Sequence, residues 1–263
     1  MTLLSSERSA VAPQKRAYPT VDLYGVPFSK MNMKETVDYL TEAVQSRRSH
    51  RVVTGNPTML MAGFEDAAFY RSLRTADLIV PDGAGVVWAA KRAGQPVPER
   101  VAGFDLMHEL LRVGDRQGWK AYLLGTTPDN IAAAHANLAV RYPGVQFVGY
   151  RDGFFTERED GAVVAAIREA NPDLLFVARS MMTQEPWLAK YQEVLQVPIM
   201  MGVGGTLDIA AGKLKRAPVL FQKLRLEWLY RLLQEPARYR RMLVLPRFVL
   251  KVVRDGDKIL KEG

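Results

Sequence analysis

The chain has 263 residues, of which 48% are hydrophobic, so it can bury the core of a large domain and is not an intrinsically disordered chain. It has no Cys, which excludes disulfides, cysteine nucleophiles and thiolate metal sites and fits a reducing compartment. It has only three His residues, which are well separated and argue against a histidine-rich metal site. The formal net charge of +8 is concentrated near one end, because residues 213–263 contain 14 Lys and Arg residues against 5 Asp and Glu residues, whereas residues 1–212 contain 22 against 23.

Residues 1–19 contain prolines, serines and scattered charges, which predict a flexible N-terminal arm. They lack the apolar run that a signal peptide needs. No window of the sequence reaches the roughly 18 to 20 uninterrupted apolar residues of a membrane-spanning helix. We therefore expect a protein that is soluble or lies on the face of a membrane.

Between residues 20 and 212, apolar runs of strand length alternate with segments of helical periodicity. The expected strands are residues 21–26, 52–54, 78–80, 121–124, 147–150, 174–177 and 199–203. The expected helices are residues 33–47, 86–90 and 104–116, one from Pro128 to before Pro143, and one through Trp187 and Tyr191. Repeated strand–helix units with nearly continuous apolar strands predict an α/β domain, in which helices cover both faces of a Rossmann-like parallel sheet.

This rhythm ends near Gly212, and the charged segment 213–218 marks a boundary. Beyond it, apolar residues recur at helical spacing among basic residues: Leu220, Phe221, Leu224, Trp228 and Leu232. Pro236 and Pro246 divide this segment into short helices. We expect residues 213–263 to form a basic, amphipathic helical appendage to the α/β domain.

Polar side chains follow two of the expected strands. Asp82 comes directly after a buried strand and precedes two glycines and a helix, while Thr54 and Asn56 follow another strand. In parallel sheets, ligands bind outside the carboxyl ends of the strands, so these residues predict a polar site. The alternative is that Asp82 caps the following helix and that Thr54 and Asn56 are turn residues before Pro57.

Residues 202–208 form a third candidate, because a strand leads through several glycines into a helix. Backbone N–H groups of Gly204, Gly205 and Thr206 could turn toward a phosphate there. The spacing matches neither the dinucleotide-binding fingerprint nor the P-loop. A tight turn without a ligand is the alternative.

The basic appendage allows three interpretations: a solvated helix face, a nucleic-acid-binding segment or a membrane-docking segment. Aromatic residues lie among its arginines, namely Trp228, Tyr230, Tyr239 and Phe248. This mixture favours docking to a membrane and not to nucleic acid. Asp255 and Asp257 have the spacing of a divalent-cation site, but flanking Arg254 and Lys258 indicate a solvated tail.

Several ordered motifs resemble the WecG/TagA/CpsF glycosyltransferases, which form glycosyltransferase family 26. They are residues 54–57, 82–86, 100–106, 184–187 and 202–208, followed by 216–218, 226–231 and 235–236. The resemblance covers about residues 20–240. One departure is residues 180–183, Ser-Met-Met-Thr, where the family usually has Gly-x-Pro before the Gln-Glu pair.

The resemblance implies an inverting bacterial enzyme that needs no metal or other cofactor. Such an enzyme moves a sugar from a UDP-sugar to a polyprenyl-diphosphate-linked saccharide, working as a peripheral protein on the cytoplasmic face of the cell membrane. Members transfer N-acetylmannosamine, its uronic acid or glucuronic acid during the synthesis of teichoic acid, enterobacterial common antigen or exopolysaccharide. The apolar residues on the appendage are also compatible with a homo-oligomer.

The resemblance also implies roles for individual residues. Asp82 matches the family's proposed base, Thr54 and Asn56 match its acceptor-pocket residues, and Gln184 matches its glutamine. The remaining candidates for substrate binding are Arg100 in the 100–106 motif and four arginines of the appendage, which would close over the site and meet the diphosphate: Arg216, Arg225, Arg231 and Arg238.

Two other functions are compatible with the sequence. A dinucleotide-dependent oxidoreductase would share the fold class, although the fingerprint spacing is missing. A non-catalytic membrane or nucleic-acid adaptor would use only the basic appendage.

Overall fold

The structure is a computed structural model that describes residues 16–224, 226–236 and 239–260. Most of the predicted N-terminal arm therefore lies outside the described residues, as do the candidate residues Arg225 and Arg238.

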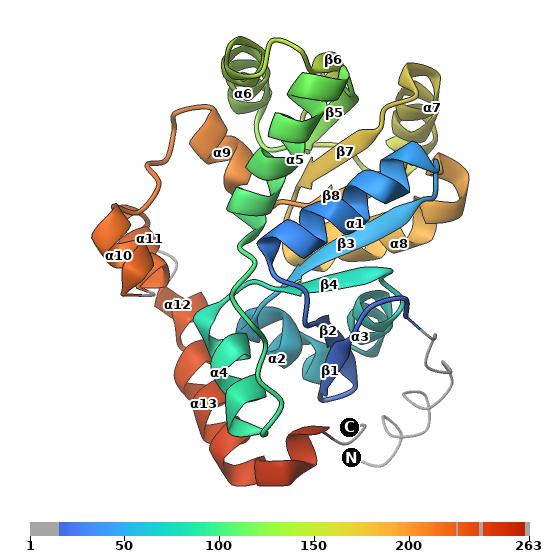
Figure 1. Ribbon diagram of the computed structural model, residues 1–263. Coiled ribbons are helices and arrows are strands. Elements are labelled where there is room, and N and C mark those ends of the chain that lie inside the picture. Colours follow the sequence, from blue (N-terminus) through green and yellow to red (C-terminus); the bar gives the residue numbers. More distant parts are fainter. Residues whose placement is uncertain (1–15, 225, 237–238, 261–263) are drawn as a thin grey trace.

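The centre of the fold is a six-stranded sheet in which all neighbouring strands are parallel. The strand order is β4-β3-β8-β7-β5-β6 (Figure 1). The strands are β3 (His50–Gly55), β4 (Leu78–Pro81), β5 (Lys120–Gly125), β6 (Gln146–Arg151), β7 (Leu174–Ala178) and β8 (Ile199–Gly202). β4, β7 and β8 are buried along their whole length, as strands covered on both faces should be. The predicted α/β fold with a Rossmann-like parallel sheet is confirmed.

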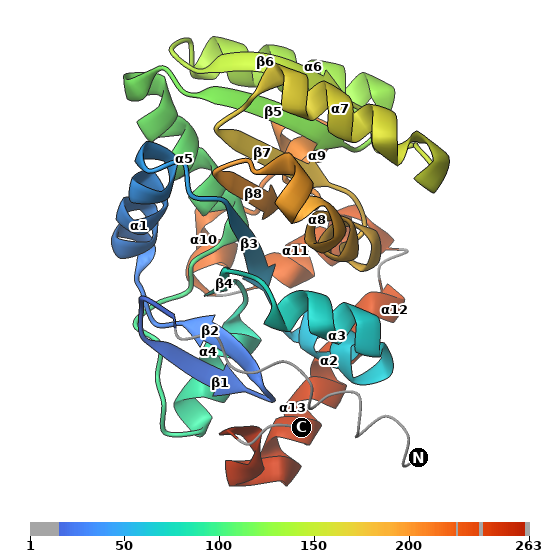
Figure 2. The same ribbon diagram turned by 90° about the vertical axis from the view of Figure 1, so that its right-hand side faces the viewer.

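Helices cover both faces of this sheet (Figure 2). Those on one face are α1 (Met33–Gln45), α5 (Gly103–Gln117) and α6 (Pro128–Arg141). Those on the other are α2 (Pro57–Glu65), α3 (Ala67–Arg74), α7 (Asp160–Ala170) and α8 (Met181–Leu195). Successive residues of a strand supply the two layers: Val52 packs with α1 and α5, whereas Val53 packs with α2 and α3.

The expected strand at residues 21–26 is wrong. The chain instead forms an antiparallel hairpin of β1 (Thr20–Leu23) and β2 (Val26–Ser29), which is separate from the parallel sheet. The hairpin turns at Tyr24 and Gly25, whose φ angles of 54° and 72° are both positive, as a two-residue type I′ turn requires. The apolar run therefore contains a turn and cannot be one strand of a strand–helix unit. The hairpin packs against α3 and against α4 (Ala84–Arg92).

Beyond β8 the chain is helical, as predicted. The elements are α9 (Thr206–Ala210), α10 (Val219–Lys223), α11 (Glu227–Gln234), α12 (Tyr239–Met242), α13 (Val244–Asp255) and the 3-10 helix η4 (Gly256–Leu260). These helices run from α9 along the side of the molecule to the hairpin (Figure 1). No helix in the described ranges combines the length and the apolar content needed to cross a membrane.

The last long helix, α13, has two different faces. Phe248 and Val252 are buried in the cluster that contains residues of α2, α4 and the hairpin. Past the end of α13, Ile259 is also buried there, and its carbonyl accepts the Tyr24 N–H at 2.7 Å. The opposite face exposes Leu250. The end of the chain is therefore fastened to the α/β domain.

Candidate active site

The carboxyl ends of β4, β3 and β8 lie side by side at one edge of the sheet. Asp82 directly follows β4, and its N–H donates to the Gly55 carbonyl at 2.9 Å. Thr54 lies near the end of β3, and its Oγ1 donates to the Gly202 carbonyl at 3.4 Å. The fold thus brings Asp82 and Thr54, 28 positions apart in the sequence, to the same edge.

Gly103, the first residue of α5, lies between these two side chains. Its N–H donates to Asp82 Oδ2 at 3.0 Å. A β-carbon on Gly103 would lie 2.7 Å from Thr54 Cγ2 and 3.3 Å from Asp82 Oδ2, so only a glycine fits without a shift. Asp82 does not cap the helix that follows it, because the N-cap of α4 is Gly83 and no side chain bonds there. Its carboxylate instead faces the start of α5.

The surroundings of Asp82 raise its affinity for a proton. Burial raises the pKa of its carboxyl group above the ordinary aspartate value, and the negative charge of Glu227 acts in the same direction. The hydrogen bond from Gly103 and the positive charges of Arg100 and Arg231 lower the pKa but do not cancel this rise. A carboxylate whose pKa is raised toward the working pH is suited to act as a general base.

The positive charges that act on Asp82 come from two different parts of the chain. Arg100 precedes α5, and Arg231 lies on α11, beyond the parallel sheet. α11 also carries Glu227, whose Oε2 and Oε1 accept hydrogen bonds from Arg100 Nη2 at 3.0 and 3.1 Å. The C-terminal helices therefore contribute charged groups to the edge where Asp82 lies.

Arg216, in the segment between α9 and α10, contacts the start of α5. Its Nη2 donates to both carboxylate oxygens of Asp105, at 2.6 and 2.8 Å. The guanidinium also lies over the Phe104 ring, 4.4 Å from the ring centroid. The charge of Asp105 also helps to raise the pKa of Arg100, so this carboxylate acts on both arginines.

Asn56 is the N-cap of α2. Its Oδ1 accepts the N–H groups of Thr58 and Met59 at 3.0 and 3.2 Å. Its Nδ2 points back to the Thr54 carbonyl, at 3.5 Å. The amide oxygen is therefore engaged, and Nδ2 is the group that Asn56 can offer to a substrate.

Gln184 and its neighbour Glu185 are buried behind the end of β8. Gln184 Nε2 donates to Glu185 Oε1 at 2.9 Å, and Gln184 Oε1 accepts the Arg179 N–H at 3.3 Å. Both side chains touch the position that a β-carbon on Gly202 would occupy. Burial raises the pKa of Glu185 to about 7, and its Oε2 has no hydrogen-bond partner among the residues that the structure describes. The sequence analysis missed Glu185, although the Gln-Glu pair of the 184–187 motif could have drawn attention to it.

The glycine-rich turn after β8 has an open outer side. Gly204 has a φ of 49°, and a β-carbon there would meet nothing within 4 Å. In the part of the chain that the structure describes, neither Gly204 nor Gly205 donates its N–H to an acceptor. Thr206 is buried, and its N–H donates to the Val203 carbonyl at 3.1 Å. Two N–H groups of the predicted set are therefore available to an anion, whereas the third is engaged.

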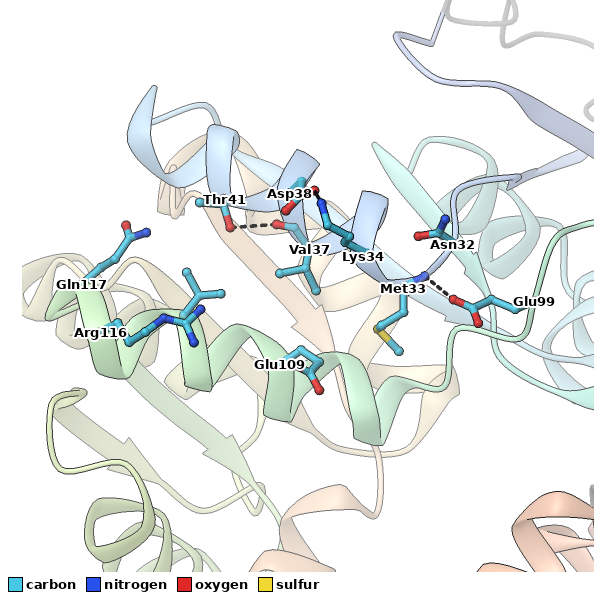
Figure 3. Close-up of a pocket in the computed structure, with 11 residues that line it drawn as sticks. Asn32, Met33, Lys34, Val37, Asp38, Thr41, Glu99, Glu109, Arg116 and Gln117 are labelled. Carbon is cyan, nitrogen blue, oxygen red and sulfur yellow. Dashed lines mark hydrogen bonds and ion pairs between the residues drawn. The ribbon is translucent and has the colours of Figure 1, made fainter.

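Two cavities lie away from this edge. One, of about 580 Å³, is a groove between α1 and α5, lined by residues such as Met33, Glu109 and Arg116 (Figure 3). The other, of about 640 Å³, is lined by residues near the C-terminal ends of α1, α7 and α8. Neither contains a predicted site residue. Among the described residues, no cluster of three or more His, Asp or Glu side chains could hold a metal ion, and Asp255 is paired with Lys251 at 2.7 Å.

Known proteins resemble this chain over nearly its whole length. The family model described as "Glycosyl transferase WecG/TagA/CpsF family" matches residues 21–261. The N-acetylglucosaminyldiphosphoundecaprenol N-acetyl-beta-D-mannosaminyltransferase of Staphylococcus aureus (strain MW2) is 35% identical over 243 residues, covering 92% of this chain and 95% of the relative. The protein of the same name from Bacillus subtilis (strain 168) is 32% identical over 237 residues, covering 90% and 92%. The chain therefore belongs to the WecG/TagA/CpsF family and is a glycosyltransferase.

Proposed function

We propose that this enzyme transfers N-acetylmannosamine from a UDP-sugar to N-acetylglucosamine linked through a diphosphate to a polyprenyl lipid. The relatives from two bacterial species carry this acceptor and this sugar in their names. The observation that carries the proposal is the position of Asp82 at the carboxyl edge of the sheet. Thr54 lies across Gly103 from it, and the charges of Arg100 and Arg231 act on its carboxyl group.

Asp82 acts as the general base. An acceptor hydroxyl gives its proton to the Asp82 carboxylate while its oxygen forms a bond to C1 of the donor sugar. The bond between C1 and the diphosphate oxygen breaks on the opposite side, so the configuration at C1 inverts and UDP leaves. The raised pKa of Asp82 supports this role, because proton transfer is most efficient when the pKa of the base is near the working pH. Thr54 Oγ1 and Asn56 Nδ2 orient the acceptor.

The departing diphosphate carries negative charge, which positive groups of the protein stabilise. Arg100, Arg231 and Arg216 supply guanidinium groups, which bind phosphate oxygens through paired hydrogen bonds. The N–H groups of Gly204 and Gly205 add two more donors beyond the end of β8. These groups provide the electrostatic stabilisation that glycosyl transfer needs.

We also propose that the C-terminal helices rest on the inner face of the cell membrane, where a lipid-linked acceptor would be held. α13 is amphipathic, and its outward residues combine apolar and basic side chains: Arg247, Val249, Leu250, Val253 and Arg254. Anionic headgroups attract such basic residues by about 1 kcal/mol each. Residues 213–263 thereby form a membrane-docking segment that also completes the active site.

A screen of UDP-sugars against short-chain polyprenyl-diphosphate N-acetylglucosamine tests the proposal. We expect transfer from UDP-N-acetylmannosamine, unchanged by a chelator, and a loss of about 10²- to 10⁴-fold in rate for Asp82→Asn. Asparagine keeps an oxygen that can accept the Gly103 N–H, so the variant should fold. Near-normal transfer by folded Asp82→Asn would exclude Asp82 as the base, and transfer from another UDP-sugar alone would exclude N-acetylmannosamine.

A further inference from the structure

The arginines that we assign to the diphosphate already face carboxylates of the protein. Arg100 binds Glu227, and Arg216 binds Asp105. With Asp82 and Arg231, the described part of this cluster contains three arginines and three carboxylates. Such a balanced cluster attracts a diphosphate only weakly. The attraction becomes strong when one carboxylate moves away from the arginine that it binds.

Glu227 is the carboxylate in the position to do so. Both of its oxygens lie 3.0 to 3.1 Å from the same nitrogen, Arg100 Nη2. While Glu227 is there, a phosphate oxygen cannot approach Nη2 from the same side. The side chains of Arg100 and Glu227 are 22% and 27% exposed, so water and ligands can reach the pair. The Glu227 carboxylate offers two oxygens to a guanidinium, as a phosphate does.

Besides this pair, contacts within the C-terminal segment hold α11. At its far end, the Gln234 side chain accepts the Lys215 N–H and donates to the Lys215 carbonyl, both at 2.9 Å. On α11 the Tyr230 ring also packs against Phe221, with centroids 5.4 Å apart. Lys215 directly precedes Arg216, which binds Asp105 on α5, so we expect α11 and Arg231 to stay near the sheet edge when Glu227 changes.

We infer that Glu227 occupies Arg100 in place of the donor's diphosphate in the resting enzyme and that the diphosphate must displace it to bind. This inference rests on the proposed function for the identity of the anion. Between reactions, Glu227 is bound to Arg100. It therefore also competes with the product UDP for the same guanidinium.

Binding of UDP and of inorganic pyrophosphate to the full-length chain, measured by calorimetry, tests this inference. Glu227→Gln keeps the size of the side chain but removes the competing charge. We expect binding of both ligands to tighten by up to about fivefold, because an exposed ion pair contributes about 0.2–1 kcal/mol. The matched control is Glu109→Gln, which removes a surface pair with Arg112 on α5 and should leave binding unchanged. In an Arg100→Ala background, Glu227→Gln should no longer tighten binding.

The possible outcomes are distinguishable. Unchanged or weaker binding by folded Glu227→Gln overturns the inference, because it makes Glu227 a structural tether and not a competitor. Tightening of pyrophosphate without any UDP binding supports the competition but refutes the proposed donor. Binding of neither ligand by the unaltered enzyme refutes both.

Discussion

Phe248 provides a sharp test of how the C-terminal helices are attached. Its side chain is 1% exposed, and its ring lies 3.5 Å from the position of a β-carbon on Gly85. Phe248→Ala should lower the free energy of unfolding by about 3–5 kcal/mol, the range for a fully buried phenylalanine. In a domain of this size each kcal/mol lowers the melting temperature by about 2–4 °C, so we expect a decrease of roughly 6–20 °C.

Leu250 is the matched control, because it lies on the same helix but is 70% exposed. Leu250→Ala should change the free energy of unfolding by less than about 0.5 kcal/mol. Because we propose that the outer face of α13 docks to a membrane, the same variant should bind less to vesicles that contain anionic lipid, so that a smaller fraction of the protein sediments with them. Thermal melting followed by circular dichroism and vesicle sedimentation, both on the full-length chain, would separate the two faces.

The result that refutes this reasoning is a Phe248→Ala variant that melts at the temperature of the unaltered enzyme. α13 would then be a detachable segment, as a separate appendage would allow. Gly85 follows Asp82 by three residues, so the site also depends on this contact. We therefore expect Phe248→Ala to reduce the transfer rate even at temperatures where the protein remains folded.

Three further predictions concern the buried carboxyl groups and the site glycine. Because burial raises the pKa of Asp82, the transfer rate should fall on acidification at a higher pH than it would with an ordinary aspartate as the base. Glu227→Gln removes a neighbouring negative charge that helps to raise this pKa, so in a profile of rate against pH the variant should lose activity at a lower pH. Burial raises the pKa of Glu185 from 4.5 to about 7, so the protonated group contributes its full stability below pH 4.5, and this contribution is lost as the pH rises through about 7. The loss corresponds to about 3 kcal/mol in the free energy of unfolding. Denaturant titrations between pH 5 and 8 should show this decrease for the unaltered enzyme but not for Glu185→Gln. Gly103→Ala should lower the transfer rate by pushing on the two neighbouring site residues, whereas Gly161→Ala, in open space on α7, should leave rate and stability nearly unchanged.

The parallel sheet was predictable because its strands are short apolar runs between helical segments. The hairpin was not, because its turn at Tyr24 and Gly25 lies within an apolar run, and tyrosine with a positive φ is not a common turn signal. Nothing in the periodicity had indicated α2, α3 or α7. Helices of 8 to 11 residues with several apolar positions give a weak periodic signal.

The positions of Asp82 and Thr54 were predictable because both follow strands, and parallel strands bring such residues to one edge. The contacts around them were not. Arg100 and Glu227 are 127 positions apart, and no local pattern indicates that they pair. Glu185 likewise looks like a surface residue until the fold buries it against Gly202. Membership of a glycosyltransferase family decides against the oxidoreductase and the non-catalytic adaptor that composition alone left open.

The uneven charge of the chain and the chemistry of the proposed site have one explanation. The sheet edge presents an acid, Asp82. Among the described residues, the arginines whose charges lower its pKa are Arg100, which precedes α5, and Arg231, which comes from beyond residue 212, as does Arg216. A leaving diphosphate needs more positive charge than one guanidinium supplies, so the basic segment must fold back onto the edge. Phe248 fastens that segment to the domain, and the outer face of the same helix stays exposed, as the proposed docking to a membrane requires. Concentrating the basic residues near one end of the chain would therefore bring the lipid-linked acceptor and the groups that stabilise the diphosphate to the same edge of the sheet.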